Sequence, residues 1–157
     1  MQQQAMAWRT AGRRVGLVPT MGALHNGHLS LIRRARRSAG EDGAVVVSVY
    51  LNPTQFSDPA DLKTYPRTVM ADKRHCRAEG ADVVFAPKTI FEKDASVMVV
   101  EDELAGRFEG EHRPGHFAGV LTVVAKLFQL VQPHEAVFGE KDFQQATLIR
   151  RMIRDLN

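Results

Sequence analysis

Short apolar runs alternate along the chain with longer segments in which apolar residues recur at helical spacing. The clearest runs are Val15–Pro19, Ala44–Leu51 and Asp82–Pro87, and Ala136–Phe138 is shorter. Nearly unbroken runs of this kind are typical of strands that are covered on both faces, as in parallel sheets. The run Ser96–Glu101 predicts a further strand at an edge of the sheet.

The segments between these runs predict helices, which alternate with the strands. Helices are expected over Leu29–Ala39, Thr68–Glu79, Gly119–Gln132 and Phe143–Leu156, and residues 7–14 form the end of a helix or a loop. The charged, glycine-rich segment Leu104–Gly119 is expected to be an ordered loop or lid. This order of elements predicts a Rossmann-like α/β fold, a doubly wound parallel sheet with helices on both faces, forming one domain over residues 1–157.

Composition narrows the class of protein without identifying a function. The 157 residues are 44% hydrophobic and 25% charged, which is ordinary for a globular domain. No apolar run approaches the roughly 20 residues of a membrane span, and the first residues lack the apolar core of a signal peptide. Together with a single cysteine, Cys76, which we expect to pack in a helix rather than react, this predicts a cytoplasmic protein with no membrane partner.

The basic cluster Arg33–Arg37 raises the question of nucleic-acid binding. Leu29, Ile32 and Ala35 fall at helical spacing around it, so the arginines are expected to form the solvated face of an amphipathic helix. The net charge of +3 is mild. We therefore expect no nucleic-acid partner.

The stretch from Val18 to His28 carries the strongest chemical signal. It holds His25 and His28 around Gly27, between a predicted strand and a predicted helix. A neutral histidine can bind a phosphate oxygen, and a helix N-terminus offers N–H groups and the positive end of its dipole. Gly27 would let a ligand approach the backbone. This setting favours a nucleotide triphosphate site, although two histidines at this spacing can also be a structural or surface pair.

Two further polar clusters follow predicted strands, Asn52–Phe56 and Gly139–Gln145. Because the ligand crevice of an open α/β sheet lies at the carboxyl ends of its strands, we expect the three clusters to converge. Lys141 is suited to a phosphate, or is an exposed surface lysine. Asp142 is a helix cap, a metal ligand or a ribose ligand. Gln55 and Gln145 suit a hydroxylated substrate better than acid–base chemistry.

The predicted lid and an acidic loop are weaker candidates. Arg113 and His116 could contact an anion or pyrophosphate, or could belong to a surface turn. Asp58 and Asp61 could reach Mg²⁺, but a solvated loop is the expected role. There is no paired-cysteine spacing for zinc and no serine in a nucleophile elbow. We therefore assign no residues as protein ligands of a metal.

Five motifs together resemble the pantoate–β-alanine ligase (pantothenate synthetase) family. They are Pro19–Leu31, Asn52–Phe56, Tyr65–Arg67, Glu109–Val120 and Phe138–Gln145. The resemblance runs from about Trp8 to the end of the sequence. Families that share the His-x-Gly-His turn include nucleotidylyltransferases, and a related nucleotidylyltransferase is one alternative.

The resemblance implies an ATP-dependent ligase that joins pantoate to β-alanine through a pantoyl adenylate, with Mg²⁺ accompanying ATP and a homodimer as the assembly. It assigns catalysis to His25, His28 and Lys141, with His28 as proton donor. It assigns ATP to Met21, Gly22, Ala23, Leu24, His25, Asn26, Gly27, His28, Gly139, Glu140, Lys141 and Asp142. It assigns pantoate and β-alanine to Pro19, Met21, Asn52, Gln55, Arg113, His116 and Gln145.

Two departures from the family pattern qualify this interpretation. Family members continue into a smaller C-terminal domain, which brings a loop over the ATP phosphates, so we expect this chain to correspond to the N-terminal domain with impaired turnover. The loop Ser57–Lys63 is also less acidic than in the family. A non-catalytic nucleotide-binding or self-associating fragment is therefore the second alternative.

Overall fold

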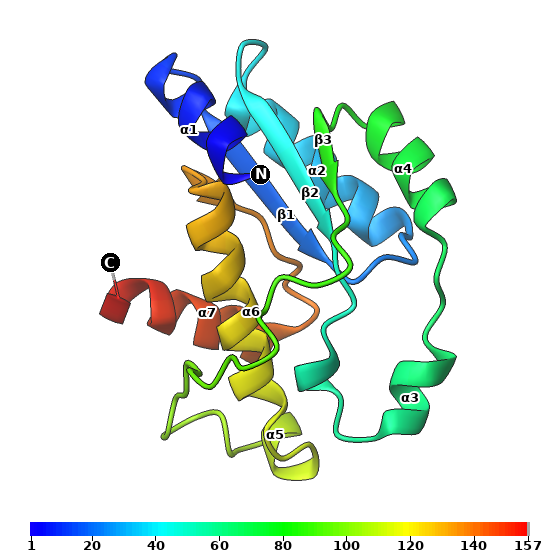
Figure 1. Ribbon diagram of the computed structural model, residues 1–157, viewed down its shortest axis with the longest axis vertical. Coiled ribbons are helices and arrows are strands. Elements are labelled where there is room, and N and C mark those ends of the chain that lie inside the picture. The colour runs from blue at the N-terminus through cyan, green and yellow to red at the C-terminus, as the bar shows by residue number, and fades with distance from the viewer. Residues whose placement is uncertain (157) are drawn as a thin grey trace. The chain divides into compact units, whose positions relative to one another are not determined.

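A computed structural model describes residues 1–156 (Figure 1). The first half contains α1 (Gln2–Thr10), β1 (Val15–Thr20), α2 (Asn26–Ala39), β2 (Ala44–Val49), the 3₁₀ turn η1 (Pro53–Gln55) and α3 (Pro59–Thr64). The second contains α4 (Val69–Ala78), β3 (Val83–Phe85), α5 (Glu109–His112), α6 (His116–Val131), β4 (Glu135–Ala136) and α7 (Phe143–Leu156). The chain divides into two compact units, described separately below.

The first unit comprises residues 1–51, 66–90 and 127–139 and contains the sheet. Its four strands are all parallel, in the order β3-β2-β1-β4. The β1–β2 register runs from Val15 opposite Ala44 to Thr20 opposite Val49. Since the strands are parallel, their carboxyl ends lie along one edge of the sheet. The predicted parallel α/β fold is confirmed.

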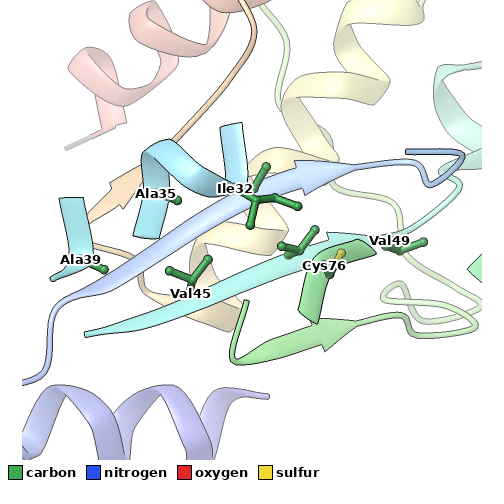
Figure 2. Close-up of a cluster of buried hydrophobic side chains, with 8 residues drawn as sticks. Ile32, Ala35, Ala39, Val45, Val49 and Cys76 are labelled. Carbon is green, nitrogen blue, oxygen red and sulfur yellow. The ribbon is translucent and has the colours of Figure 1, made fainter. Parts of the chain in front are cut away.

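Helices α2 and α4 bury one face of this sheet. Ile32, Ala35 and Ala39 of α2 and Cys76 of α4 pack against strand residues that include Val45 and Val49 (Figure 2). Residues of the same strands that alternate with this set are also buried, among them Leu17 and Val46. Side chains alternate between the faces of a strand, so the second face is covered too. Helix α1 contacts β1 and contributes buried Ala5 and Trp8.

The arginines of α2 lie where the amphipathic pattern places them. Arg33, Arg34 and Arg37 are exposed, whereas Arg36 is half-buried and donates to the Asp82 carboxylate at 2.9 Å. Cys76 is fully buried, and burial together with the charge of Asp72 raises its pKa to about 11. The thiol therefore packs in the core, as the sequence predicts, and stays protonated at neutral pH.

The second unit comprises residues 52–65, 91–126 and 140–156. It contains η1, α3, α5, α7 and most of α6, and buried side chains come mainly from α6 and α7, among them Phe117, Leu121, Leu148 and Ile149. The single domain over residues 1–157 stays a prediction.

The expected edge strand over Ser96–Glu101 is wrong. This segment has no regular secondary structure, and Val97 is 85% exposed. Instead of a neighbouring strand, the N–H of Val99 donates to Oγ1 of Thr122 in α6 at 2.9 Å. An apolar run becomes a strand only where another strand accepts its backbone hydrogen bonds, and here a helix side chain takes that place.

Several predicted boundaries also change. Helix α2 begins at Asn26 rather than Leu29 because His25 caps it, and β4 covers residues 135–136 rather than 136–138. The polar segment after Ser57 contains α3, capped by Asp58, whose carboxylate accepts from the N–H of Ala60 at 2.7 Å. The expected lid contains α5, and α6 begins at His116 rather than Gly119.

Candidate functional site

The turn after β1 is shaped by backbone that most residues avoid. Gly22 has φ +88° and Ala23 has φ +52°, both in the left-handed region. A non-glycine residue adopts this region only at a cost. The hydroxyl of Thr20 at the end of β1 accepts from the N–H of Gly22 and donates to the carbonyl of Ser48 in β2. The turn therefore starts from a fixed point at the carboxyl edge of the sheet.

Asp72 of α4 holds the next part of the turn. Its carboxylate accepts from the N–H groups of Ala23 at 3.2 Å and Leu24 at 2.9 Å, and from the hydroxyl of Thr68 at 3.1 Å. The side chain is 1% exposed. No sequence motif predicted a role for Asp72. The one signal for it was its position four residues before buried Cys76, which places an acidic side chain on the apolar face of the helix.

His25 and His28 form a reciprocal cap at the start of α2. Nδ1 of His25 accepts from the N–H of Gly27 at 3.1 Å, and Nδ1 of His28 accepts from the N–H of His25 at 3.4 Å. Their ring centroids are 4.1 Å apart. With Nδ1 an acceptor in both rings, each neutral imidazole carries its proton on Nε2. Both rings therefore take part in capping the helix.

This geometry changes the expected role of Gly27. A Cβ at Gly27 would lie 2.8 Å from Cε1 of His25, so the missing side chain makes room for the imidazole. The prediction that glycine leaves the backbone open to a ligand therefore gives way to a packing role. The N–H of Gly27 is already bonded to Nδ1 of His25.

The segment Gly139–Asp142 crosses from one unit to the other. Gly139 is half-buried in the first unit, next to Leu31, whereas Glu140, Lys141 and Asp142 are exposed in the second. The carbonyl of Asp142 accepts from the N–H of Ala146 at 2.9 Å, which begins α7. Asp142 is thus the residue just before the helix, and Lys141 is an exposed cation.

In the second unit, several predicted substrate residues form a buried polar cluster around η1. Nδ2 of Asn52 donates to Oε1 of Gln55 and to the carbonyl of Gly119 in α6, each at 3.1 Å. Nδ1 of His116 lies 2.7 Å from the carbonyl of Gln55. Asn52, Gln55 and His116 are all buried. The structure therefore brings together residues more than 60 positions apart.

His116 is a neutral donor in this cluster. Burial lowers its pKa, and the positive charge of Arg113 acts in the same direction. The bond to Gln55 and the negative charges of Glu109 and Asp142 raise it but do not outweigh burial. Because the Gln55 carbonyl can only accept, Nδ1 of His116 carries the proton. Arg113 itself pairs with Glu109 at 2.8 Å.

Two further residues, to which the sequence assigned no role, hold the segment before α5 by hydrogen bonds. Nε2 of Gln144 donates to the carbonyls of Leu104 and Arg107, and its Oε1 accepts from the N–H of Glu109. Glu101 accepts from the N–H groups of Leu104 and Ala105 and pairs with Arg151. Burial opposes ionisation of Glu101, but these partners outweigh it and lower its pKa. The neighbouring Gln145 is half-buried in the first turn of α7.

The acidic and imidazole side chains do not form a metal cage. Within residues 1–156, no group of three or more His, Cys, Asp or Glu side chains is placed to hold a metal ion. Mg²⁺ usually retains waters and binds through substrate phosphates with few protein ligands. None of the helices in the described chain is long and apolar enough to cross a membrane.

Comparison with known sequences confirms the resemblance. The profile of the pantoate-beta-alanine ligase family matches residues 1–157. Pantothenate synthetase of Saccharopolyspora erythraea is 55% identical over 153 residues, which cover 96% of this chain and 50% of that protein. The Akkermansia muciniphila protein of the same name is 54% identical over 91% of this chain and 52% of its own length. The chain thus spans about half the length of these relatives.

Solved structures agree with this result. Pantothenate synthetase of Thermus thermophilus matches with a TM-score of 0.86 and 48% identity, over 97% of this chain and 56% of that one. A Francisella tularensis pantoate-beta-alanine ligase, crystallised with β,γ-ATP and β-alanine, matches with a TM-score of 0.88 and 42% identity. That match covers 98% of this chain and 60% of the other. The fold and the sequence therefore point to the same group of proteins.

Proposed function

Since the chain belongs to the pantoate-beta-alanine ligase family, we propose that it supplies the ATP- and pantoate-binding part of an AMP-forming ligase. The carboxylate of pantoate attacks the α-phosphorus of ATP, and pyrophosphate leaves. The amine of β-alanine then attacks the acyl carbon of the pantoyl adenylate, giving pantothenate and AMP. The relatives named pantothenate synthetase are about twice as long as this chain, so the complete reaction is proposed for a protein of that length.

The paired imidazoles after β1 are the observation that carries the proposal. In both rings Nδ1 accepts a backbone N–H, so the proton of each neutral imidazole lies on Nε2. Negative charge grows on pyrophosphate as it leaves, and fixed donors stabilise that charge without a covalent step. We assign the turn Met21–His28 to the ATP phosphates, with His28 as the proton donor, and Gly139–Asp142 to ATP as well. Lys141 supplies a cation, and Mg²⁺ accompanies the triphosphate.

The neutral cluster of the second unit suits the other substrate. Asn52, Gln55 and His116 offer amide and imidazole groups in a buried setting, where hydrogen bonds to hydroxyl groups discriminate strongly. We assign Gln55 and Gln145 to pantoate, with Gln55 also near β-alanine. Pro19 and Met21 complete the pantoate assignment. Arg113, half-buried and paired with Glu109, is assigned to an anionic group.

Calorimetric titration with ATP and Mg²⁺ tests the nucleotide assignment. The chain is expected to bind ATP, and His28→Ala is expected to weaken binding by at least tenfold, since it removes one donor to a phosphate. His75→Ala is the matched control, because His75 is an exposed histidine of α4 in the same unit. It should leave the Kd within about twofold. Absence of ATP binding, or equal binding by wild type and His28→Ala, would overturn the assignment.

Release of pyrophosphate tests the reaction class. We expect the chain to release pyrophosphate slowly from ATP, and only when pantoate is present. The need for pantoate follows from a mechanism in which the pantoate carboxylate is the nucleophile. Release at the same rate without pantoate would indicate hydrolysis of ATP and would contradict the ligase reaction. Transfer of AMP onto a phosphate ester would instead identify a nucleotidylyltransferase.

A further inference from the structure

We propose that Asp72 is a positioning residue of the His25–His28 turn: its buried carboxylate fixes the turn's backbone, and through it the orientation of both imidazoles. The inference rests on the proposed function for its consequence, ATP binding, but not for the structural effect itself. No sequence motif pointed to this residue. Asp72 and the residues that it contacts all belong to the first unit.

The contacts of Asp72 converge on the residues just before the histidines. Its two carboxylate oxygens accept from the successive N–H groups of Ala23 and Leu24, at 3.2 and 2.9 Å. The next residue is His25, whose own N–H and Nδ1 make both bonds of the helix cap. A shift of the backbone at Leu24 is therefore passed directly to the cap, with no flexible segment between them.

The backbone at this point needs such an anchor. Ala23 holds φ +52°, a conformation that costs free energy for any residue with a Cβ. Gly22, at φ +88°, lets the carboxylate approach, because a Cβ there would lie 3.2 Å from Oδ2 of Asp72 and 3.1 Å from Cγ1 of Val49. The turn is thus strained at one residue and closely packed at the other, and the hydrogen bonds that its N–H groups donate to Asp72 offset the strain.

The burial of the charge gives the anchor its rigidity. Asp72 is 1% exposed, and among residues 1–156 its hydrogen-bond donors are the two N–H groups and the Thr68 hydroxyl, with no cation paired to it. A buried charge is tolerated only while its donors stay in place. Any movement of the turn away from Asp72 therefore leaves a buried carboxylate without donors, so the turn is held in one shape.

The test compares two aspartates of the same unit whose carboxylates accept backbone N–H groups. In Asp72→Asn, one carboxylate oxygen becomes an NH₂ group that cannot accept from the turn. Asp82→Asn is the matched control, because Asp82 also accepts a backbone N–H, that of Val45 at 2.7 Å, and also contacts a side chain, Arg36. Asp82 lies at the start of β3, and Val45 near the start of β2, away from the carboxyl edge.

Imidazole ¹⁵N spectra of the chain without ATP give the primary readout. We expect Asp72→Asn to shift the Nδ1 signals of His25 and His28, since their cap bonds change, and to leave His75 unchanged. Asp82→Asn should leave all three unchanged. In the ATP titration, Asp72→Asn should raise the Kd at least tenfold and Asp82→Asn less than twofold. Folded Asp72→Asn with wild-type His25 and His28 signals would overturn the proposal.

Two further variants test the role of Asp72 independently of the first. Ala23→Gly removes the strain at φ +52°, so adding it to Asp72→Asn should move the two histidine signals part of the way back toward wild type. If Asp72→Asn does not fold, Asp72→Glu compared with Asp82→Glu gives the same decision, because the longer side chain displaces the carboxylate. If wild type binds no ATP, the proposed function fails, while the spectra still judge Asp72.

Discussion

The two clusters of predicted site residues use histidine in opposite ways. In the first unit, His25 is exposed and His28 half-buried, and each accepts a backbone N–H at Nδ1 and carries its proton on Nε2. In the second unit, His116 is buried, donates from Nδ1 to the Gln55 carbonyl and has a lowered pKa. The first pair caps a helix at an exposed turn, whereas the second histidine belongs to a buried, neutral polar cluster.

The difference extends to the groups that hold each cluster. A buried carboxylate, Asp72, fixes the exposed histidine turn through backbone N–H groups. Amide side chains and backbone carbonyls fix the buried cluster, where Asn52 joins Gln55 to Gly119. A charged side chain therefore anchors the exposed turn, and neutral groups hold the buried cluster together. Glycine substitutions distinguish the two, because each cluster packs against a glycine.

The largest effect is expected from Gly119→Ala in the buried cluster. A Cβ at Gly119 would lie 2.5 Å from the carbonyl oxygen of Thr54 and 2.8 Å from the backbone N of Gln55. Backbone cannot move aside cheaply, so we expect a loss of roughly 1–3 kcal/mol in the free energy of unfolding, measured by urea denaturation. Gly106→Ala is the control, because nothing lies within 4 Å of a Cβ there. Equal effects of the two substitutions would contradict this packing.

The second largest effect is a pH dependence of the free energy of unfolding that comes from buried His116. The pKa of His116 is lowered in the folded state, so the unfolded chain binds this proton more readily. Its contribution to stability is therefore complete above the unfolded pKa of about 6.5 and is lost as pH falls below it. The slope from this group is at most about 1.4 kcal/mol per pH unit.

His116→Gln tests this pH dependence by urea denaturation between pH 5 and pH 8. We expect the variant to lose part of the decline in stability on the acid side of about pH 6.5, because its amide does not titrate there. His112→Gln is the control for removing an imidazole from the same unit, since His112 is exposed on α5. A decline of the same steepness in wild type and His116→Gln would contradict a neutral His116.

Much of the fold could be predicted because its signals are local. The runs that become β1 and β2 are nearly continuous, and the turn between β1 and α2 carries its glycines and histidines within ten residues. The run Ser96–Glu101 is equally apolar but is no strand, since strand formation depends on a partner that the local sequence does not specify.

The supporting residues of both clusters could not be predicted for the same reason. Asp72 contacts backbone 48 and 49 positions earlier, and Gln144 contacts backbone 35 to 40 positions earlier. The local sequence around Asp72 does not distinguish it from a surface residue of an amphipathic helix. Gln144 lies in the predicted cluster Gly139–Gln145, but nothing in that cluster indicates its distant backbone partners. Residues with recognisable chemistry, such as His25 and Gln55, could be named, whereas those that hold them in place become visible only in the fold.

The smallest effect on stability is expected from Gly27→Ala in the exposed turn. A Cβ there would lie 2.8 Å from Cε1 of His25, which is the far end of a mobile side chain, so the ring can swing away. The lost cap costs about 1 kcal/mol, and alanine in place of glycine in α2 returns about as much. We therefore expect unfolding free energy within about 0.5 kcal/mol of wild type, but a displaced imidazole and weaker ATP binding. Loss of stability as large as that of Gly119→Ala would mean that the two clusters are equally rigid, and the contrast between them would fail.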